Sequence, residues 1–217
     1  MPIKIIIADD HKIIRDGLSS MIGREPDLEV VAEAENGREA VKLALEINPD
    51  VVVMDIVMPE LNGIEAAQQI TSSNPKIKIV ALSMHTDRRF VTRMLKSGAS
   101  GYLLKDGAFK ELAVAIRTVM AGQIYLTPRV QGVVVDEYLH NRDVDENTGL
   151  PSLTIREKEV LQLLAEGKST KEVASHIHVS VKTVETHRQN IMKKLNITTL
   201  AELVKYAIRE GLTTLES

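Results

Sequence analysis

The sequence predicts an α/β fold, a doubly wound parallel sheet of five strands, followed by a smaller domain made only of helices. Three observations support this prediction. Short apolar runs alternate with helix-like segments through residues 1–125, residues 152–217 contain helix signals but no strand signal, and a polar stretch separates the two parts. Alternating strands and helices are typical of a parallel sheet that carries helices on both faces.

The strands are predicted from short apolar runs bounded by turn residues. Val51-Val52-Val53-Met54 is the clearest run, because a strand that is apolar on both faces is typical of the centre of a parallel sheet. The predicted strands span residues 3–8, 28–34, 51–54, 77–82 and 101–104. The helices between and after them span residues 13–23, 37–47, 63–73, 87–97 and 108–122. Asn74-Pro75, Gly98 and Gly101 punctuate the boundaries.

Three segments follow from this order of elements. Residues 1–125 form the first predicted domain, residues 126–151 a linker, and residues 152–217 the second domain. The linker includes the stretch Val133–Leu139, which is able to extend a helix, and the polar residues 141–149. A short distorted loop within a single domain is the alternative interpretation of the polar stretch.

Four helices are predicted in the second domain, over residues 154–165, 170–177, 181–195 and 199–210. Three of them start with a capping box, in which Ser or Thr is followed three residues later by Glu. These pairs are Thr154 with Glu157, Ser169 with Glu172, and Thr199 with Glu202. Ser180 is a suitable N-cap for the remaining helix, and Gly167 and Gly211 suit C-terminal ends.

The composition excludes several classes of function. The 217 residues include no cysteine, so disulfides, thiol catalysis and cysteine-ligated zinc are excluded. A hydrophobic content of 44% supports packed cores, which must depend on aliphatic residues because aromatic residues make up only 3%. Neither a leader sequence nor an apolar run of membrane-spanning length is present, which predicts a cytoplasmic protein that does not contact the membrane.

The charge is unevenly distributed along the chain. The net charge is −3, but from Ser152 onward 10 Lys and Arg face 8 Asp and Glu, whereas the residues before it carry 17 against 22. This asymmetry has the sign expected of an acidic module joined to one that faces nucleic acid.

Polar residues with complementary chemistry occur where four of the predicted strands end. They are Asp9 and Asp10 after the first strand, Asp55 after the third, Ser83 after the fourth and Lys105 after the fifth. In a doubly wound sheet of the flavodoxin-like order 2-1-3-4-5, the carboxyl ends of these strands face one crevice. Three carboxylates gathered there would repel one another unless a cation or protons lay among them.

This set of side chains suits phosphoryl transfer to a carboxylate. Mg²⁺ favours one or two carboxylates together with waters and phosphate oxygens. Lys105 and Ser83 are able to contact further phosphoryl oxygens, so catalysis would consist mainly of positioning and charge neutralisation. The product would be a labile acyl phosphate on Asp55. Each residue alone is a weak signal, since paired aspartates after a strand are often only a turn or a helix cap.

The first 125 residues resemble the receiver domains of bacterial two-component response regulators, and the whole chain resembles the NarL/FixJ group. Four stretches carry the receiver resemblance, and they begin at the first, third, fourth and fifth predicted strands. They are Ile5-Ile6-Ile7-Ala8-Asp9-Asp10-His11, Val53-Met54-Asp55-Ile56-Val57-Met58-Pro59, Leu82-Ser83-Met84 and Gly101-Tyr102-Leu103-Leu104-Lys105-Asp106.

The resemblance implies a role for each pocket residue. Asp55 would accept the phosphoryl group, and Mg²⁺ would be bound by Asp9, Asp10, Asp55 and the backbone carbonyl of Val57. Ser83 and Lys105 would contact the phosphoryl group, and Tyr102 would couple to Ser83 by moving inward. Many receivers have proline after the lysine, but here Asp106 follows Lys105, so we expect no cis peptide bond at that position. We expect His11 and His85 to lie outside the ligand set, because imidazole prefers softer metals than Mg²⁺.

The segment 169–195 has the pattern of a helix-turn-helix. Apolar residues such as Val173, Ile177, Val184 and Ile191 form the inner stripes of two short helices. The outward face of the second helix carries Lys182, Glu185, Thr186, Gln189 and Lys193, with Arg188 on its flank. A polar stripe one helix wide is what reading of the major groove requires. The alternative is an ordinary solvated helix face.

Residues 152–217 also resemble the LuxR-type DNA-binding domain, most closely in Leu153-Thr154-x-Arg156-Glu157-x-Glu159-Val160-Leu161 and in Ser180-Val181-Lys182-Thr183-Val184-Glu185-Thr186-His187. This resemblance implies that Glu185, Thr186 and Gln189 face base edges. It also implies that Lys182, Thr183, Arg188 and Lys193 contact phosphates, which makes binding strongly dependent on salt.

Together the two resemblances imply a phosphorylation-dependent transcription regulator. Its partners would be a cognate sensor histidine kinase, double-stranded promoter DNA, a second copy of the chain paired through the last helix, and RNA polymerase. Two rival functions are disfavoured by the sequence. Aspartate-nucleophile phosphatases carry a second Asp two residues after the nucleophile, where this chain has Val57, and a phosphate-independent DNA binder would have lost pocket residues that are all present.

Overall fold

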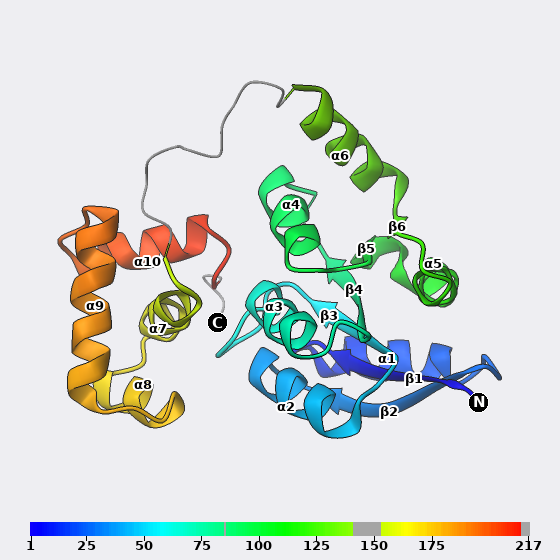
Figure 1. Cartoon of the computed structure of the whole chain (residues 1–217), viewed down its shortest axis with the longest axis horizontal. Helices are drawn as coiled ribbons and strands as arrows, with labels where there is room; N and C mark the ends of the chain where they lie inside the picture. The colour runs from blue at the N-terminus through cyan, green and yellow to red at the C-terminus, as the bar shows by residue number, and fades with distance from the viewer. Residues whose placement is uncertain (85, 141–152, 214–217) are drawn as a thin grey trace. The chain divides into compact units, whose positions relative to one another are not determined.

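The computed structural model describes residues 1–84, 86–140 and 153–213, and the chain divides into two compact units (Figure 1). The first unit contains the elements from β1 to α6, and the second contains those from α7 to α10. The polar segment 141–149 and His85 lie outside the described residues.

The first unit is built on one parallel sheet with the strand order β2-β1-β3-β4-β5-β6. The strands are β1 (Ile3–Ala8), β2 (Leu28–Ala34), β3 (Val51–Asp55), β4 (Lys78–Ser83), β5 (Gly101–Leu104) and β6 (Tyr125–Leu126). The α/β fold and the predicted order of the first five strands are confirmed. All five residues of β3 are buried, as expected of a central strand.

The strand β6 corrects the predicted number of five strands. The backbone N–H of Tyr125 donates to the carbonyl of Ser100 at 3.0 Å, and the N–H of Thr127 donates to the carbonyl of Tyr102 at 3.2 Å. Gly122, with a φ of 79°, lies between α5 and this strand, in a conformation that glycine adopts without strain. A strand of two residues is too short to show the alternation from which strands are predicted.

Helices cover both faces of the sheet (Figure 1). On one face, α1 (Lys12–Ile22) and α5 (Lys105–Met120) pack side chains such as Leu18 and Leu112 against Ile7 and Val53 of the strands. The other three helices are α2 (Gly37–Ile47), α3 (Gly63–Ser73) and α4 (Arg88–Lys96). They begin at the side-chain caps Asn36, Asn62 and Asp87, each of which accepts a hydrogen bond from a backbone N–H of the first turn.

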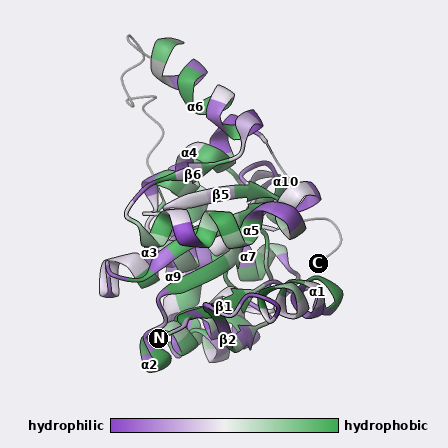
Figure 2. Ribbon diagram, turned by 90° about the vertical axis from the view of Figure 1, so that its right-hand side faces the viewer, coloured by the Kyte–Doolittle hydropathy of each residue, from purple (hydrophilic) through white to green (hydrophobic). Residues whose placement is uncertain are grey.

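The helix α6 (Pro128–His140) falls in the range predicted to be a linker. The helical extension expected over Val133–Leu139 is present, and it begins earlier because Pro128 occupies the first helical position, where a missing N–H has no cost. Alternating hydrophilic and hydrophobic residues along α6 are visible in Figure 2. The helix packs against α4, and Arg88 forms an ion pair with Glu137.

The second unit contains the four predicted helices, α7 (Ile155–Ala165), α8 (Thr170–His176), α9 (Val181–Leu195) and α10 (Leu200–Arg209). All three predicted capping boxes are present, and Ser180 caps α9 through a hydrogen bond from the Thr183 N–H. Val160, Val173, Val184 and Ile191 are fully buried in a common core. Among the residues of this unit that the structure describes there is no strand.

Candidate functional site

Three carboxylates converge at the carboxyl edge of the sheet. Asp9 and Asp10 follow β1, and Asp55 is the last residue of β3. One ligand atom from each of these residues and from His11 lies within 4.8 Å of the others. Asp9 is fully buried and Asp55 is 5% exposed. The predicted gathering of the acids is therefore present, and the cluster has the composition of a site for a metal ion.

Lys105 lies between the two buried acids. Its Nζ is 2.6 Å from Oδ2 of Asp55 and 2.7 Å from Oδ2 of Asp9. Burial alone would lower the pKa of Lys105, but the neighbouring Asp55 and Asp9 carboxylates outweigh it, so the pKa is raised and the ammonium stays charged. Lys105 is the first residue of α5. The helix starts three positions before its predicted start at residue 108, so the segment Lys105-Asp106-Gly107 is helical.

The carboxyl group of Asp55 has an unusual titration. Burial raises its pKa to about 6, the charges of Asp9 and Asp10 act in the same direction, and Lys105 opposes them. At neutral pH the group is still mostly ionised. An ionised, partly desolvated carboxylate next to an ammonium is suited to act as a nucleophile toward an electrophilic centre that carries negative charge.

Ser83 and Tyr102 lie on neighbouring strands beside this cluster. Ser83 ends β4 and is 1% exposed, whereas Tyr102 in β5 is fully buried, with its ring inside the protein. Burial raises the pKa of Tyr102 to about 12, and a hydrogen bond with Ser83 opposes that shift. The two residues therefore contact each other in this structure. The described residues include no cis peptide bond, so the bond after Lys105 is trans, as expected.

The turn that follows Asp55 is packed closely against it. Val57 is half-buried, and its neighbour Ile56 accepts a hydrogen bond from the N–H of Gly63 at 2.8 Å. A Cβ atom at Gly63 would lie 1.8 Å from the carbonyl oxygen of Asp55. Gly63 is therefore required for the approach of α3 to the site. This role was not predicted, because a close approach of two backbones leaves no local signal in the sequence.

Arg15 is a second residue of this region that the sequence did not single out. It is 4% exposed, and its Nη1 donates to the backbone carbonyl of Asp9 at 2.8 Å. The available signal is its position, because Arg15 shares the buried face of α1 with Leu18 and Ile22, and arginine is rarely buried without a specific partner.

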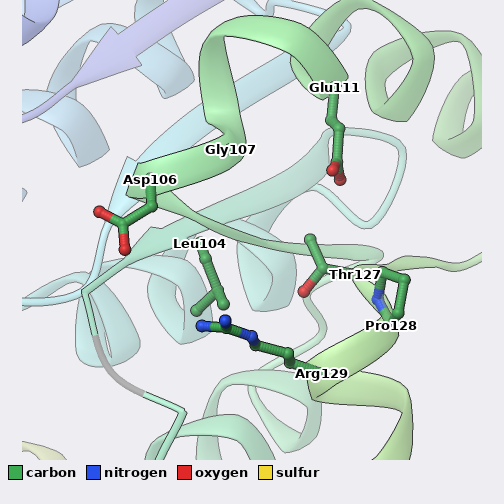
Figure 3. Close-up of a pocket in the computed structure, with 7 residues that line it drawn as sticks. All are labelled: Leu104, Asp106, Gly107, Glu111, Thr127, Pro128 and Arg129. Carbon is green, nitrogen blue, oxygen red and sulfur yellow. The ribbon is translucent and has the colours of Figure 1, made fainter.

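The cavity shown in Figure 3 is separate from the cluster formed by Asp9, Asp10, Asp55 and Lys105. It has a volume of about 390 Å³ and lies between the starts of α5 and α6. Its lining consists of Leu104, Asp106, Gly107, Glu111, Thr127, Pro128 and Arg129. No residue of the predicted site is among them, so the cavity is not the candidate phosphoryl site.

In the second unit, α8 and α9 form the two helices of the predicted helix-turn-helix. The turn between them contains His178 with a φ of 54°, and Ser180 starts α9. All but one of the predicted DNA-contact residues are exposed, and Arg188 is half-buried. The exposed ones are Lys182, Thr183, Glu185, Thr186, Gln189 and Lys193. The hydroxyl of Thr186 donates to the Lys182 carbonyl at 2.9 Å, and that of Thr183 is 2.8 Å from the hydroxyl of Ser180.

The opposite side of α9 is fixed to the core of its unit. Val184 and Ile191 are fully buried there. Lys194 Nζ lies 2.7 Å from Oε2 of Glu157 in α7. The polar stripe of α9 is therefore presented by a rigidly held helix. None of the described helices combines the length and the apolarity that a membrane crossing requires.

Comparisons with known proteins match each of the two units to a known family. Residues 5–117 match the response regulator receiver domain, and residues 151–207 match the luxR family of bacterial regulatory proteins. The chain is 39% identical to the transcriptional regulatory protein DegU of Brevibacillus brevis, covering 96% of this chain and 94% of DegU. It is 40% identical to the oxygen regulatory protein NreC of Staphylococcus carnosus, covering 96% and 98%.

A solved structure shows the same combination of domains. The RcsB response regulator of Salmonella typhimurium is 26% identical, with a TM-score of 0.59, and the match covers 94% of this chain and 97% of RcsB. The family models and the relatives together span nearly the whole chain. The chain therefore belongs to the two-component response regulators of the NarL/FixJ type, transcription regulators in which phosphorylation of a receiver controls a LuxR-type DNA-binding domain.

Proposed function

We propose that Asp55 is the phosphoryl acceptor of this regulator and that a cognate sensor histidine kinase is the donor. The observation that carries the proposal is the convergence of Asp9, Asp10, Asp55 and Lys105 in one partly buried site. Three carboxylates against one ammonium leave an excess of negative charge that a divalent cation would balance. Asp55 is the last residue of β3, an inner strand of the sheet, and its carboxylate contacts Lys105 at 2.6 Å.

The donor set fits Mg²⁺. Carboxylates of Asp9, Asp10 and Asp55 and the backbone carbonyl of Val57 are hard oxygen ligands of the kind that Mg²⁺ prefers. When bound, Mg²⁺ would screen the charge of the carboxylates from that of an incoming phosphoryl group. We place His11 outside the ligand set, although its Nδ1 lies 2.8 Å from Oδ1 of Asp10, since imidazole prefers softer metals.

The transfer would break one bond and form one. An oxygen of Asp55 attacks phosphorus, and the bond from phosphorus to the imidazole nitrogen of the kinase histidine breaks, leaving an acyl phosphate on Asp55. Lys105, which contacts Asp55 at 2.6 Å, would then pair with a phosphoryl oxygen. The Ser83 hydroxyl would donate to another, and its contact with Tyr102 would pass the change to β5.

The second step would be binding of promoter DNA in the cytoplasm. Glu185, Thr186 and Gln189 would face base edges, and Lys182, Thr183, Arg188 and Lys193 would contact phosphates. Solved structures of RcsB include dimers bound to DNA. We propose that this chain likewise acts as a homodimer, paired through α10, and that it contacts RNA polymerase at promoters.

Mass measurement of the intact chain tests the phosphorylation site. Acetyl phosphate and Mg²⁺ should add one phosphoryl group to the wild type and none to Asp55→Asn, because the amide is not a nucleophile at this site. Asp16→Asn is the matched control, since Asp16 is an exposed carboxylate of α1 that pairs with Lys12. If Asp55→Asn gained phosphate as readily as Asp16→Asn, the assignment of Asp55 would be wrong.

A further inference from the structure

The position of Asp9 is fixed by hydrogen bonds to its own backbone and carboxylate. Its N–H donates to the carbonyl of Ala34 at 3.2 Å, and its Oδ1 accepts a hydrogen bond from the N–H of His11 at 2.9 Å. Its carbonyl oxygen accepts from Nη1 of Arg15 at 2.8 Å. Because Asp9 is fully buried, its carbonyl would have no water to replace that donor.

Arg15 connects the end of β1 to the end of β2. It lies in α1, and its Nη2 is 2.6 Å from Oε1 of Glu35, while its Nε is 3.4 Å from Oε2 of Glu33. A buried guanidinium is stable only when it is paired and hydrogen-bonded. Here the Asp9 carbonyl and the Glu35 carboxylate accept hydrogen bonds from it, whereas Glu33 contributes its charge without a hydrogen bond to Nε. The two glutamates also compensate its charge, so that it does not repel a cation bound nearby.

An irregularity of β2 brings the two glutamates to Arg15. Ile5 pairs with Val30, but Ile6 pairs with Ala32, so one residue of β2 is bulged out of the register. Leu28 and Val30 pack against the core beneath α1, and strict alternation would then point Glu33 away from it. The bulge reverses the alternation, so Glu33 pairs with Ile7 and lies on the side of α1. Bulges next to functional sites commonly reorient side chains in this way.

We infer that Arg15 is a positioning residue for the metal-binding carboxylate of Asp9, held in place by Glu33 and Glu35. The inference rests on the proposed function, because it assumes that Asp9 is a ligand of Mg²⁺. Residues that hydrogen-bond to a metal-ligating group orient it, and their loss typically lowers metal affinity by about 10- to 100-fold. Without Arg15 the peptide after Asp9 would rotate to satisfy its buried carbonyl, and the carboxylate would leave its place in the cluster.

Calorimetric titration of the full chain with Mg²⁺ tests this inference. Arg15→Met should weaken Mg²⁺ binding by about tenfold or more. Arg24→Met, which removes an exposed arginine just beyond α1, should bind Mg²⁺ as the wild type does. A purely structural role for Arg15 would lower the stability of the receiver but leave Mg²⁺ affinity unchanged, and that result would overturn the inference.

Arg15→Lys keeps the test valid if Arg15→Met does not fold. Lysine retains the charge but lacks the fork that reaches Asp9 and Glu35 together, so Mg²⁺ binding should again be weaker, and an unchanged affinity would again overturn the inference. In phosphorylation by acetyl phosphate, the half-saturating Mg²⁺ concentration should rise in this variant while the rate at saturating Mg²⁺ stays near that of the wild type.

The two readouts separate this inference from the proposed function. If the wild type bound Mg²⁺ but accepted no phosphoryl group on Asp55, the proposed function would fail, and weaker Mg²⁺ binding by the Arg15 variants would still support the positioning role. If the wild type were phosphorylated and both Arg15 variants had its Mg²⁺ dependence, the inference alone would fail.

Discussion

At the scale of single residues, the acidic site depends on close contacts that tolerate little change. Gly63 is the clearest case, because a Cβ atom there would meet the carbonyl oxygen and carbon of Asp55 at 1.8 and 2.9 Å. Both are backbone atoms, so the strand end or the start of α3 would have to move. We expect Gly63→Ala to lower the free energy of unfolding by about 1–3 kcal/mol, the usual cost of overpacking, and to slow phosphorylation of Asp55.

Gly132→Ala is the control for this change. Gly132 lies in α6, and a Cβ atom there would meet nothing within 4 Å, so alanine should raise the free energy of unfolding by up to about 1 kcal/mol through its helix propensity. Urea unfolding of both variants, together with the rate of phosphorylation, makes the comparison. Equal stability of the two variants would show that α3 can move away from Asp55 at no cost.

Most of the site residues could be predicted from the sequence because they end strands. The apolar runs that end at Asp9, Asp55 and Ser83 specify parallel strands, and the topology brings their carboxyl ends together. Arg15 and Gly63 could not be assigned in this way. Their roles depend on a bulge in β2 and on the distance between two backbones, and neither leaves a periodic pattern in the chain.

At the scale of elements, the start of α7 combines three interactions on one carboxylate. Glu157 accepts hydrogen bonds from the N–H of Thr154 at 2.7 Å and from the Thr154 hydroxyl at 3.0 Å, and Lys194 Nζ of α9 lies 2.7 Å away. Burial would raise the pKa of Glu157, but Lys194 and the two donors of Thr154 outweigh it and the pKa is lowered. A carboxyl group whose pKa is lower in the folded state stabilises the fold above its unfolded pKa, and this contribution is lost as the pH falls through its folded pKa.

We therefore expect Glu157→Gln to expose the amides of α7 to faster hydrogen exchange at neutral pH. The loss corresponds to about 1.5–3 kcal/mol, the range for hydrogen bonds to charged groups. The difference from the wild type should shrink as the pH falls below about 4.5, where the glutamate of the unfolded chain is protonated. Glu185→Gln, at an exposed position of α9, is the control and should leave the exchange of α7 unchanged. A difference that persisted undiminished at low pH would contradict the electrostatic explanation.

Element boundaries were predicted best where capping residues define them. The helices α7, α8 and α10 begin directly after the predicted N-caps Thr154, Ser169 and Thr199. The start of α5 was misplaced, because Lys105-Asp106-Gly107 has the composition of a turn but continues directly from β5 as a helix. Packing of that helix against the sheet outweighs the weak local preference of glycine.

At the scale of the whole molecule, the charges are divided between two tasks. The residues before Ser152, which include the proposed phosphoryl site, carry an excess of acids, and those from Ser152 onward carry an excess of bases, which favours binding to DNA. The two tasks communicate in this family through phosphorylation. The most direct test of how the two sites are coupled is therefore to change one site and to measure the activity of the other.

We expect phosphorylation to raise the affinity for a promoter fragment in the wild type but not in Asp55→Asn, as measured by fluorescence anisotropy on a fragment chosen by genome-wide mapping of bound sites.

Lys193→Gln should weaken binding to every DNA sequence. It should also reduce by about one the slope of log affinity against log salt concentration (the salt slope), as expected for the loss of one phosphate contact. Gln189→Ala should instead relax the sequence preference and leave the slope unchanged, because base contacts release no counterions. Lys42→Gln, at an exposed position of α2 in the first unit, is the control for the loss of a positive charge. If Lys42→Gln and Lys193→Gln lowered the slope equally, the effect would come from net charge alone, and the stripe on α9 would not be the surface that binds DNA.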